Sequence, residues 1–160
     1  SLTPALAARA KVLAGSVTAA TAAVAADAAA FVVVARDALA GPGALRIGPG
    51  ITLGAAPEEP GLAPVPAIAA VLAPAGLRPG DLAQVEMMEA YAVQAIACVQ
   101  GAGLDPRRVN LRGGALARGH PIGASGAILA VRLFHDLRAG QGLAAIAAAG
   151  GLGTAALFSR

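Results

Sequence analysis

The sequence has no tryptophan, a single cysteine and few charged residues. Because Cys98 is alone, the chain forms no internal disulfide and has no CxxC pair that could hold a metal. We expect no metal site, Cys98 as a core residue, and a reducing compartment, with the cytoplasm as the default. Aromatic residues make up 2% of the chain and hydrophobic residues 57%, which predicts a core of Ala, Val, Leu and Ile.

Only 13% of the residues are charged, and this scarcity bears on the binding partners. The net charge of +3 comes from scattered arginines, and no aromatic residues are interleaved among Arg107, Arg108 and Arg112. This pattern does not indicate nucleic-acid binding. A surface so poor in charge predicts that another chain covers part of it, so we expect an oligomer.

The length of 160 residues suffices for one domain plus a fragment of another. Gly, Pro or Asp interrupts the apolar runs before they reach the roughly 18 residues that a membrane helix needs. No charged-then-apolar leader opens the sequence. We therefore expect no membrane segment.

The first forty residues contain two predicted elements. Residues 17–30 are rich in alanine and predict a helix, and the β-branched run at 31–35 predicts a strand covered on both faces. One helix and one strand cannot form a domain, so they must join a sheet whose other strands come from elsewhere. The sequence Gly41-Pro42-Gly43 then marks a domain boundary.

The remaining residues predict an α/β domain with the order βαβαβαββ. Strands separated by helices must run parallel, whereas the last two, joined by a short glycine turn, should pair antiparallel in a mixed five-stranded sheet. The expected strands are 44–54, 84–87, 108–112, 142–148 and 154–158, and the expected helices are 64–75, 89–100 and 122–137.

His120 lies in a tight glycine- and proline-containing turn before the helix predicted at 122–137. Gly119 permits the turn, Pro121 suits the first turn of a helix, and the unpaired amides there favour negative charge. A neutral imidazole at this place can donate a hydrogen bond to a substrate oxygen. The alternative is a histidine that only satisfies the turn.

Four stretches in order resemble the carboxy-terminal half of thiolases: Val85–Ala92, Val109–Ala115, Gly119–Gly126 and Gly142–Gly153. A complete thiolase has two βαβαβαββ halves. The resemblance implies that residues 1–41 end an incomplete amino-terminal thiolase-like domain, with one helix and one strand. Residues 42–160 then form the carboxy-terminal thiolase-like domain. The nucleophilic cysteine of the family belongs to the missing half, so a protein partner must supply that half.

The resemblance also implies the roles of the site residues. His120 matches the histidine that activates the nucleophile and donates to the thioester oxygen. Met88 replaces the asparagine that holds an oxyanion water, and Ala147 replaces a second, proton-transferring cysteine. Ala149 matches the glycine whose N–H serves the other oxyanion hole. Three further residues match positions that contact substrate or coenzyme A, although packing alone also explains them: Ala23, Ala90 and Tyr91.

Two functions fit these residues. In the first, the chain acts with the partner in acyl-CoA chemistry, either thiolytic cleavage or Claisen-type condensation of a thioester, with coenzyme A as substrate or product and no other cofactor. In the second, it is a noncatalytic thiolase-fold protein that assembles with a catalytic partner and stabilises it. Met88 and Ala147 favour the second because neither side chain performs the family's polar chemistry.

Overall fold

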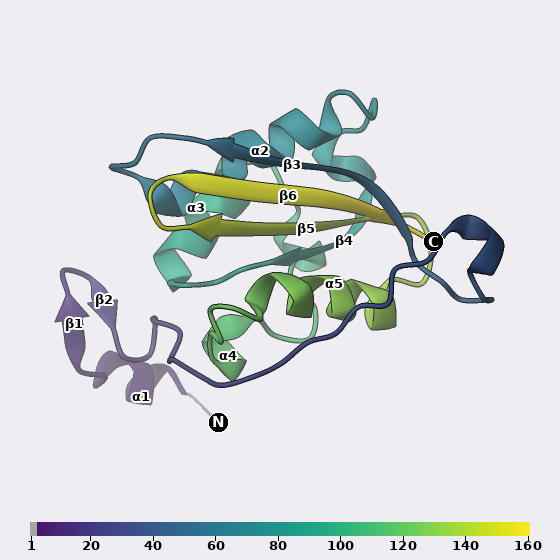
Figure 1. Ribbon diagram of the computed structural model, residues 1–160. Coiled ribbons are helices and arrows are strands. Elements are labelled where there is room, and N and C mark those ends of the chain that lie inside the picture. The colour runs from purple at the N-terminus through teal and green to yellow at the C-terminus, as the bar shows by residue number, and fades with distance from the viewer. Residues whose placement is uncertain (1–2) are drawn as a thin grey trace.

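The computed structural model describes residues 3–160, and its centre is a mixed four-stranded sheet (Figure 1). The strand order is β3-β6-β5-β4. β4 and β5 run parallel, and β6 is antiparallel to both of its neighbours. The predicted α/β class and strand directions are therefore confirmed. The bounds are β3 Arg46–Gly54, β4 Leu82–Met87, β5 Gln141–Ala148 and β6 Leu152–Ser159.

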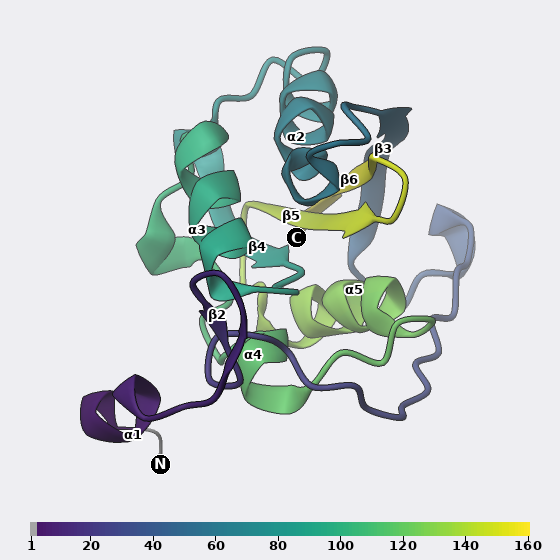
Figure 2. The same cartoon turned by 90° about the vertical axis from the view of Figure 1, so that its left-hand side faces the viewer.

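Helices cover both faces of this sheet, as Figures 1 and 2 show. α2 and α3 lie on one face, where Ile68 and Val71 pack with Leu143 and Leu157 in the main hydrophobic core. α4 and α5 lie on the other. The bounds are α2 Pro64–Leu72, α3 Ala92–Gly101, α4 Ala115–Arg118 and α5 Ser125–Asp136, with 3-10 turns at Asp37–Leu39, Pro60–Leu62, Pro79–Asp81 and Pro106–Arg108.

The predicted fifth strand at 108–112 does not form, so the expected count of five strands is wrong. Val109 makes one parallel bridge to Val85 of β4, and the strand ends there because Asn110 has a φ of 49°. The Asn110 side chain instead accepts from the Met87 N–H at 2.8 Å and donates to the Met87 carbonyl at 2.9 Å. One amide side chain thus replaces the next pair of ladder bonds at this edge of the sheet.

The opposite edge of the sheet is β3, whose pairing with β6 is irregular between Ile47 and Gly50. Pro49 lies in this irregular part and has no backbone N–H to donate. Proline and a bulge are typical of edge strands. Both edges of the sheet therefore differ from regular strand backbone.

The helix predicted at 17–30 is wrong. α1 (Pro4–Ala8) and the hairpin of β1 (Val12–Ala14) and β2 (Val17–Thr18) come first, and the chain then runs without a helix to residue 36. Backbone groups at 21–24 bond to residues far away in the sequence: Ala23 N–H to Ala90, Thr21 carbonyl to Ala92, and Val24 carbonyl to His120. Tertiary hydrogen bonds here override the helix propensity of alanine.

The strand predicted at 31–35 is also absent, because these residues pair with no strand among residues 3–160. The segment runs along α5 in both views (Figures 1 and 2). Its apolar side chains stay open to water, with Phe31 88% and Val33 94% exposed. A β-branched sequence without a sheet is thus the main unpartnered feature of the described chain.

Candidate functional site

The backbone around His120 is fixed by the segment at 24–26. The His120 N–H donates to the Val24 carbonyl at 2.8 Å, and Ala25 forms a parallel bridge with His120. Gly119 has a φ of 93°, and a Cβ built on it would lie 2.7 Å from the Ala26 Cβ. Glycine is therefore required both for the turn and for the close approach of the two chains.

The imidazole of His120 is bonded to the start of α5. Its Nδ1 lies 2.7 Å from the Ser125 Oγ, which donates its proton to the Pro121 carbonyl at 3.0 Å. α5 begins at Ser125, three residues later than predicted, and His120 precedes it, as expected. Partial burial lowers the pKa of His120 below 6.5, because desolvation disfavours the imidazolium. The ring is therefore neutral at pH 7.

The segment at 21–25 joins the predicted binding residues to the histidine. Ala23 donates to the Ala90 carbonyl at 2.9 Å and packs against the small apolar cluster that contains Met88, and Ala22 bridges Tyr91. The same segment reaches His120 two residues later. Residues from three distant parts of the sequence thus meet at one place. Their roles in substrate binding remain predictions.

Met88 and Ala147, the two positions where the family's polar residues are replaced, lie at the carboxyl ends of β4 and β5. Met88 follows β4, is buried, and donates its N–H to the Ala145 carbonyl of the neighbouring strand at 2.9 Å. Ala147 is near the end of β5, opposite Gly153 of β6, and Ala149 lies exposed in the turn that follows. The Ala149 N–H bonds to no other group among residues 3–160, so this donor is available. No side chain at these three positions donates a hydrogen bond.

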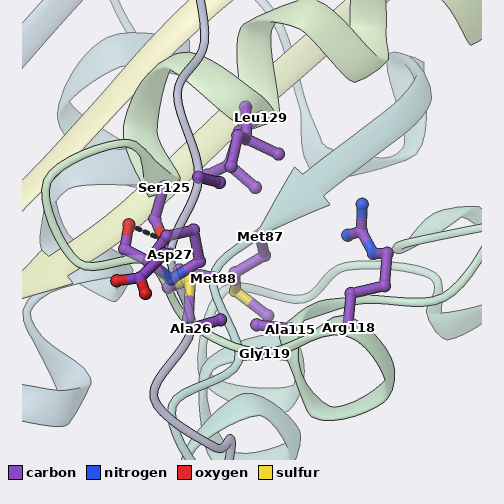
Figure 3. Close-up of a pocket in the computed structure, with 12 residues that line it drawn as sticks. Ala26, Asp27, Met87, Met88, Ala115, Arg118, Gly119, Ser125 and Leu129 are labelled. Carbon is purple, nitrogen blue, oxygen red and sulfur yellow. Dashed lines mark hydrogen bonds between the residues drawn. The ribbon is translucent and has the colours of Figure 1, made fainter.

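A cavity of about 170 Å³ lies between the segment at 26–28, the end of β4 and the start of α5. Figure 3 shows Ser125 and Arg118 on opposite sides, with Met87 and Met88 between them. Apolar atoms make up most of the wall. His120, Ala23, Ala90 and Tyr91 are not part of the lining, so the imidazole does not open into this cavity. A second hollow of about 640 Å³ lies along α3, away from His120.

An ion pair couples the helix that follows His120 to the sheet. Arg132 of α5 bonds Glu86 of β4, which is 0% exposed, and also donates to the Gly113 carbonyl at 2.9 Å. Gln84 donates to the other oxygen of Glu86 at 3.1 Å. The charges and their hydrogen bonds thus hold α5 against β4. Sequence reasoning missed this pair, because Arg132 and Glu86 are 46 residues apart.

Glu89 caps the start of α4. Its carboxylate accepts from the Leu116 N–H at 3.2 Å in the first turn of α4 and from the Asn110 side chain. Gly114 leaves room for it, because a Cβ there would overlap the carboxylate. The Gly-Gly sequence before α4 was the available signal for this close approach.

Comparison with known proteins assigns the family. Residues 44–160 match the profile described as "Thiolase, C-terminal domain". The chain is 44% identical over 110 residues to beta-ketothiolase BktB of Cupriavidus necator, covering 67% of this chain and 28% of that protein. It is 42% identical over 111 residues to a putative acetyl-CoA C-acetyltransferase, VraB, of Staphylococcus aureus, covering 69% and 29%. The chain belongs to the thiolase family.

Solved structures give the same assignment for the fold. The Acat5 thiolase of Ascaris suum, in complex with coenzyme A, superposes with a TM-score of 0.87 at 33% identity, covering 99% of this chain and 44% of that one. Human mitochondrial 3-ketoacyl-CoA thiolase, also with coenzyme A, gives 0.81 at 34% identity, covering 91% and 39%. The chain thus spans less than half the length of these relatives.

Within residues 3–160, no helix is long and apolar enough to cross a bilayer. The same residues contain no group of three or more His, Cys, Asp or Glu side chains that could hold a metal ion.

Proposed function

We propose that this chain takes part in acyl-CoA chemistry, thiolytic cleavage or Claisen-type condensation of a thioester, together with a chain that supplies the nucleophile. The observation that carries the proposal is the neutral His120, bonded through Nδ1 to Ser125 in a chain of the thiolase family. Its Nε2 bonds to no group among residues 3–160 and the ring is partly exposed. A base is thus open to a reacting group from outside the chain.

The chemistry follows from this geometry. The partner's cysteine thiol gives its proton to His120 Nε2, and the thiolate attacks the carbonyl carbon of the thioester. The protonated Nε2 then donates to the carbonyl oxygen as negative charge develops there. When the carbon–sulfur bond of the thioester breaks, coenzyme A leaves as a thiol with that proton, and the acyl group stays on the cysteine. The Ala149 N–H supports this proposal as a second donor.

The partner is an amino-terminal thiolase half, and the unpaired segment 31–34 is its docking site. The chain spans 28% to 44% of its relatives' lengths, so most of each relative lies outside the matched part. Residues 31–34 are four consecutive apolar residues without a strand partner. A segment of this kind can pair as an added strand with the edge of a sheet in the amino-terminal half. We further propose an oligomer in the cytoplasm.

Replacing Val33 with aspartate tests the docking site. We expect binding to the separately produced amino-terminal half of a relative to weaken by at least about 10-fold, because a buried carboxylate is costly. Size-exclusion chromatography and titration calorimetry measure this. Val93→Asp is the matched control, since Val93 is an exposed apolar residue on α3, across the sheet. Equal binding of both variants would contradict the docking site.

The noncatalytic alternative is favoured by Met88 and Ala147, which provide neither an oxyanion donor nor a proton-transferring group. Losing such groups typically costs about 10²- to 10³-fold and 10²- to 10⁴-fold in rate, respectively. In this alternative, the chain stabilises a catalytic partner through its fold alone.

Restoring both groups distinguishes the two functions. We expect the native complex to show acyl transfer, and Met88→Asn with Ala147→Cys to raise thiolysis by at least about 10²-fold. Ala148→Cys is the control, because successive residues of a strand point to opposite faces. An inactive native complex with an active double variant would instead establish the noncatalytic function. Activity is measured by release of acetyl-CoA from a 3-ketoacyl-CoA.

A further inference from the structure

We infer that Ser125 is a positioning residue that fixes the tautomer of His120 and thereby places both proton-transfer roles on one nitrogen. The hydroxyl has one proton to donate, and we assign it to the Pro121 carbonyl, which lies 3.0 Å away and can only accept. Towards His120, 2.7 Å away, the oxygen then acts as acceptor. The proton of the neutral ring therefore resides on Nδ1, and the lone pair is on Nε2.

Burial makes this arrangement specific. Ser125 is 3% exposed, so water does not compete effectively for its hydroxyl. The Pro121 carbonyl also accepts the N–H groups of Ala124 and Ser125, each at 2.9 Å. The turn at 121–125 thus holds the acceptor of the Ser125 proton in place, and α5 holds the hydroxyl. A ring bonded to such a fixed group has a defined orientation as well as a defined tautomer.

The inference deepens the proposed function and rests on it only for the catalytic consequence. With the proton on Nδ1, Nε2 accepts the thiol proton and the same nitrogen then donates to the thioester oxygen. With the proton on Nε2, that nitrogen could donate but could not accept the thiol proton, because the lone pair would then be on Nδ1. The hydroxyl of Ser125 therefore determines whether His120 can begin the reaction.

The tautomer can be measured on the 160-residue chain alone by ¹⁵N NMR of the histidine rings. We expect the Nδ1–H form for His120 above its pKa, and in Ser125→Ala a shift of the population towards Nε2–H. Ser125→Thr keeps the hydroxyl and should restore the native spectrum. His135, late in α5, is an internal control whose signals should not change.

Two outcomes would overturn the inference: a native His120 in the Nε2–H form, or a tautomer unaffected by Ser125→Ala in a variant that still folds by circular dichroism. If the alanine variant does not fold, the native spectrum alone decides. In the complex, we expect Ser125→Ala to lower kcat by about 10- to 100-fold, with KM nearly unchanged, and threonine to recover most of it. An inactive native complex with the expected NMR result would reject the proposed function but retain the positioning role.

Discussion

Replacing His120 with alanine is expected to lower acyl transfer by the reconstituted complex by about 10²- to 10⁴-fold. The neutral Nε2 is the proposed base, and the alanine variant has no ring to take this role. Among the described side chains, no other one bonds to Ser125. Steady-state assays of coenzyme A release would measure the loss. Because burial holds the pKa of His120 below 6.5, kcat/KM should stay constant near pH 7 and fall only as the pH drops through that lower pKa.

His135→Ala is the matched control for this experiment. His135 is the second histidine of the chain and lies in the last turn of α5, where its ring contacts Phe134. Among the described residues, it forms no hydrogen bond or ion pair with the turn that holds His120. We expect full activity in this variant. Unchanged turnover in His120→Ala, with the complex intact, would reject catalysis through His120.

Replacing Arg132 with methionine is expected to lower the free energy of unfolding by about 3–5 kcal/mol. The substitution leaves the fully buried Glu86 carboxylate with Gln84 as its remaining hydrogen-bond partner. Replacing both members of the pair, Glu86→Leu with Arg132→Met, should recover part of this loss, because no unpaired charge stays buried, although Gln84 loses its acceptor. Urea denaturation followed by circular dichroism measures all three proteins.

The exposed ion pair of Arg46 and Asp37 provides the control. Its atoms lie 2.9 Å apart, but both side chains are largely in water. Arg46→Met should therefore change the unfolding free energy by no more than about 1 kcal/mol. If Arg132→Met costs as little as Arg46→Met, the buried pair does not hold α5 against β4.

Hydrophobic pattern and turn residues predicted the elements that form through local sequence. The strand over 44–54 and the helix from Pro64 both form near their expected bounds, and the last two strands pair antiparallel as expected. Each is bounded by glycine or proline, which mark the ends of the elements in the sequence. Burial of Cys98 is likewise confirmed.

The failures occur where long-range contacts replace local ones. Alanine-rich residues at 17–30 have high helix propensity, but their backbone groups bond to Ala90, Ala92 and His120 instead. Asn110 ends a strand by adopting a positive φ and bonding Met87. Neither partner can be inferred from nearby sequence, so neither outcome was predictable by periodicity.

The candidate site was predictable only in part. His120 stood out because of its glycine and proline neighbours, and the family resemblance added Met88, Ala147 and Ala149. Ser125 was visible in the same stretch, but its bond to the ring depends on how the chain folds back over five residues. Fractional exposure and hydrogen-bond direction require coordinates.

The irregular edges of the sheet limit how this protein can associate. On β3, Pro49 removes a donor that an incoming strand would need, and on β4 the side chain of Asn110 occupies the positions where such a strand would bond. Copies of the chain are thereby discouraged from stacking edge to edge into fibrils. The segment at 31–34 is then the main stretch of the described chain open to a new strand, and its exposed β-branched residues would favour aggregation unless a partner covers them.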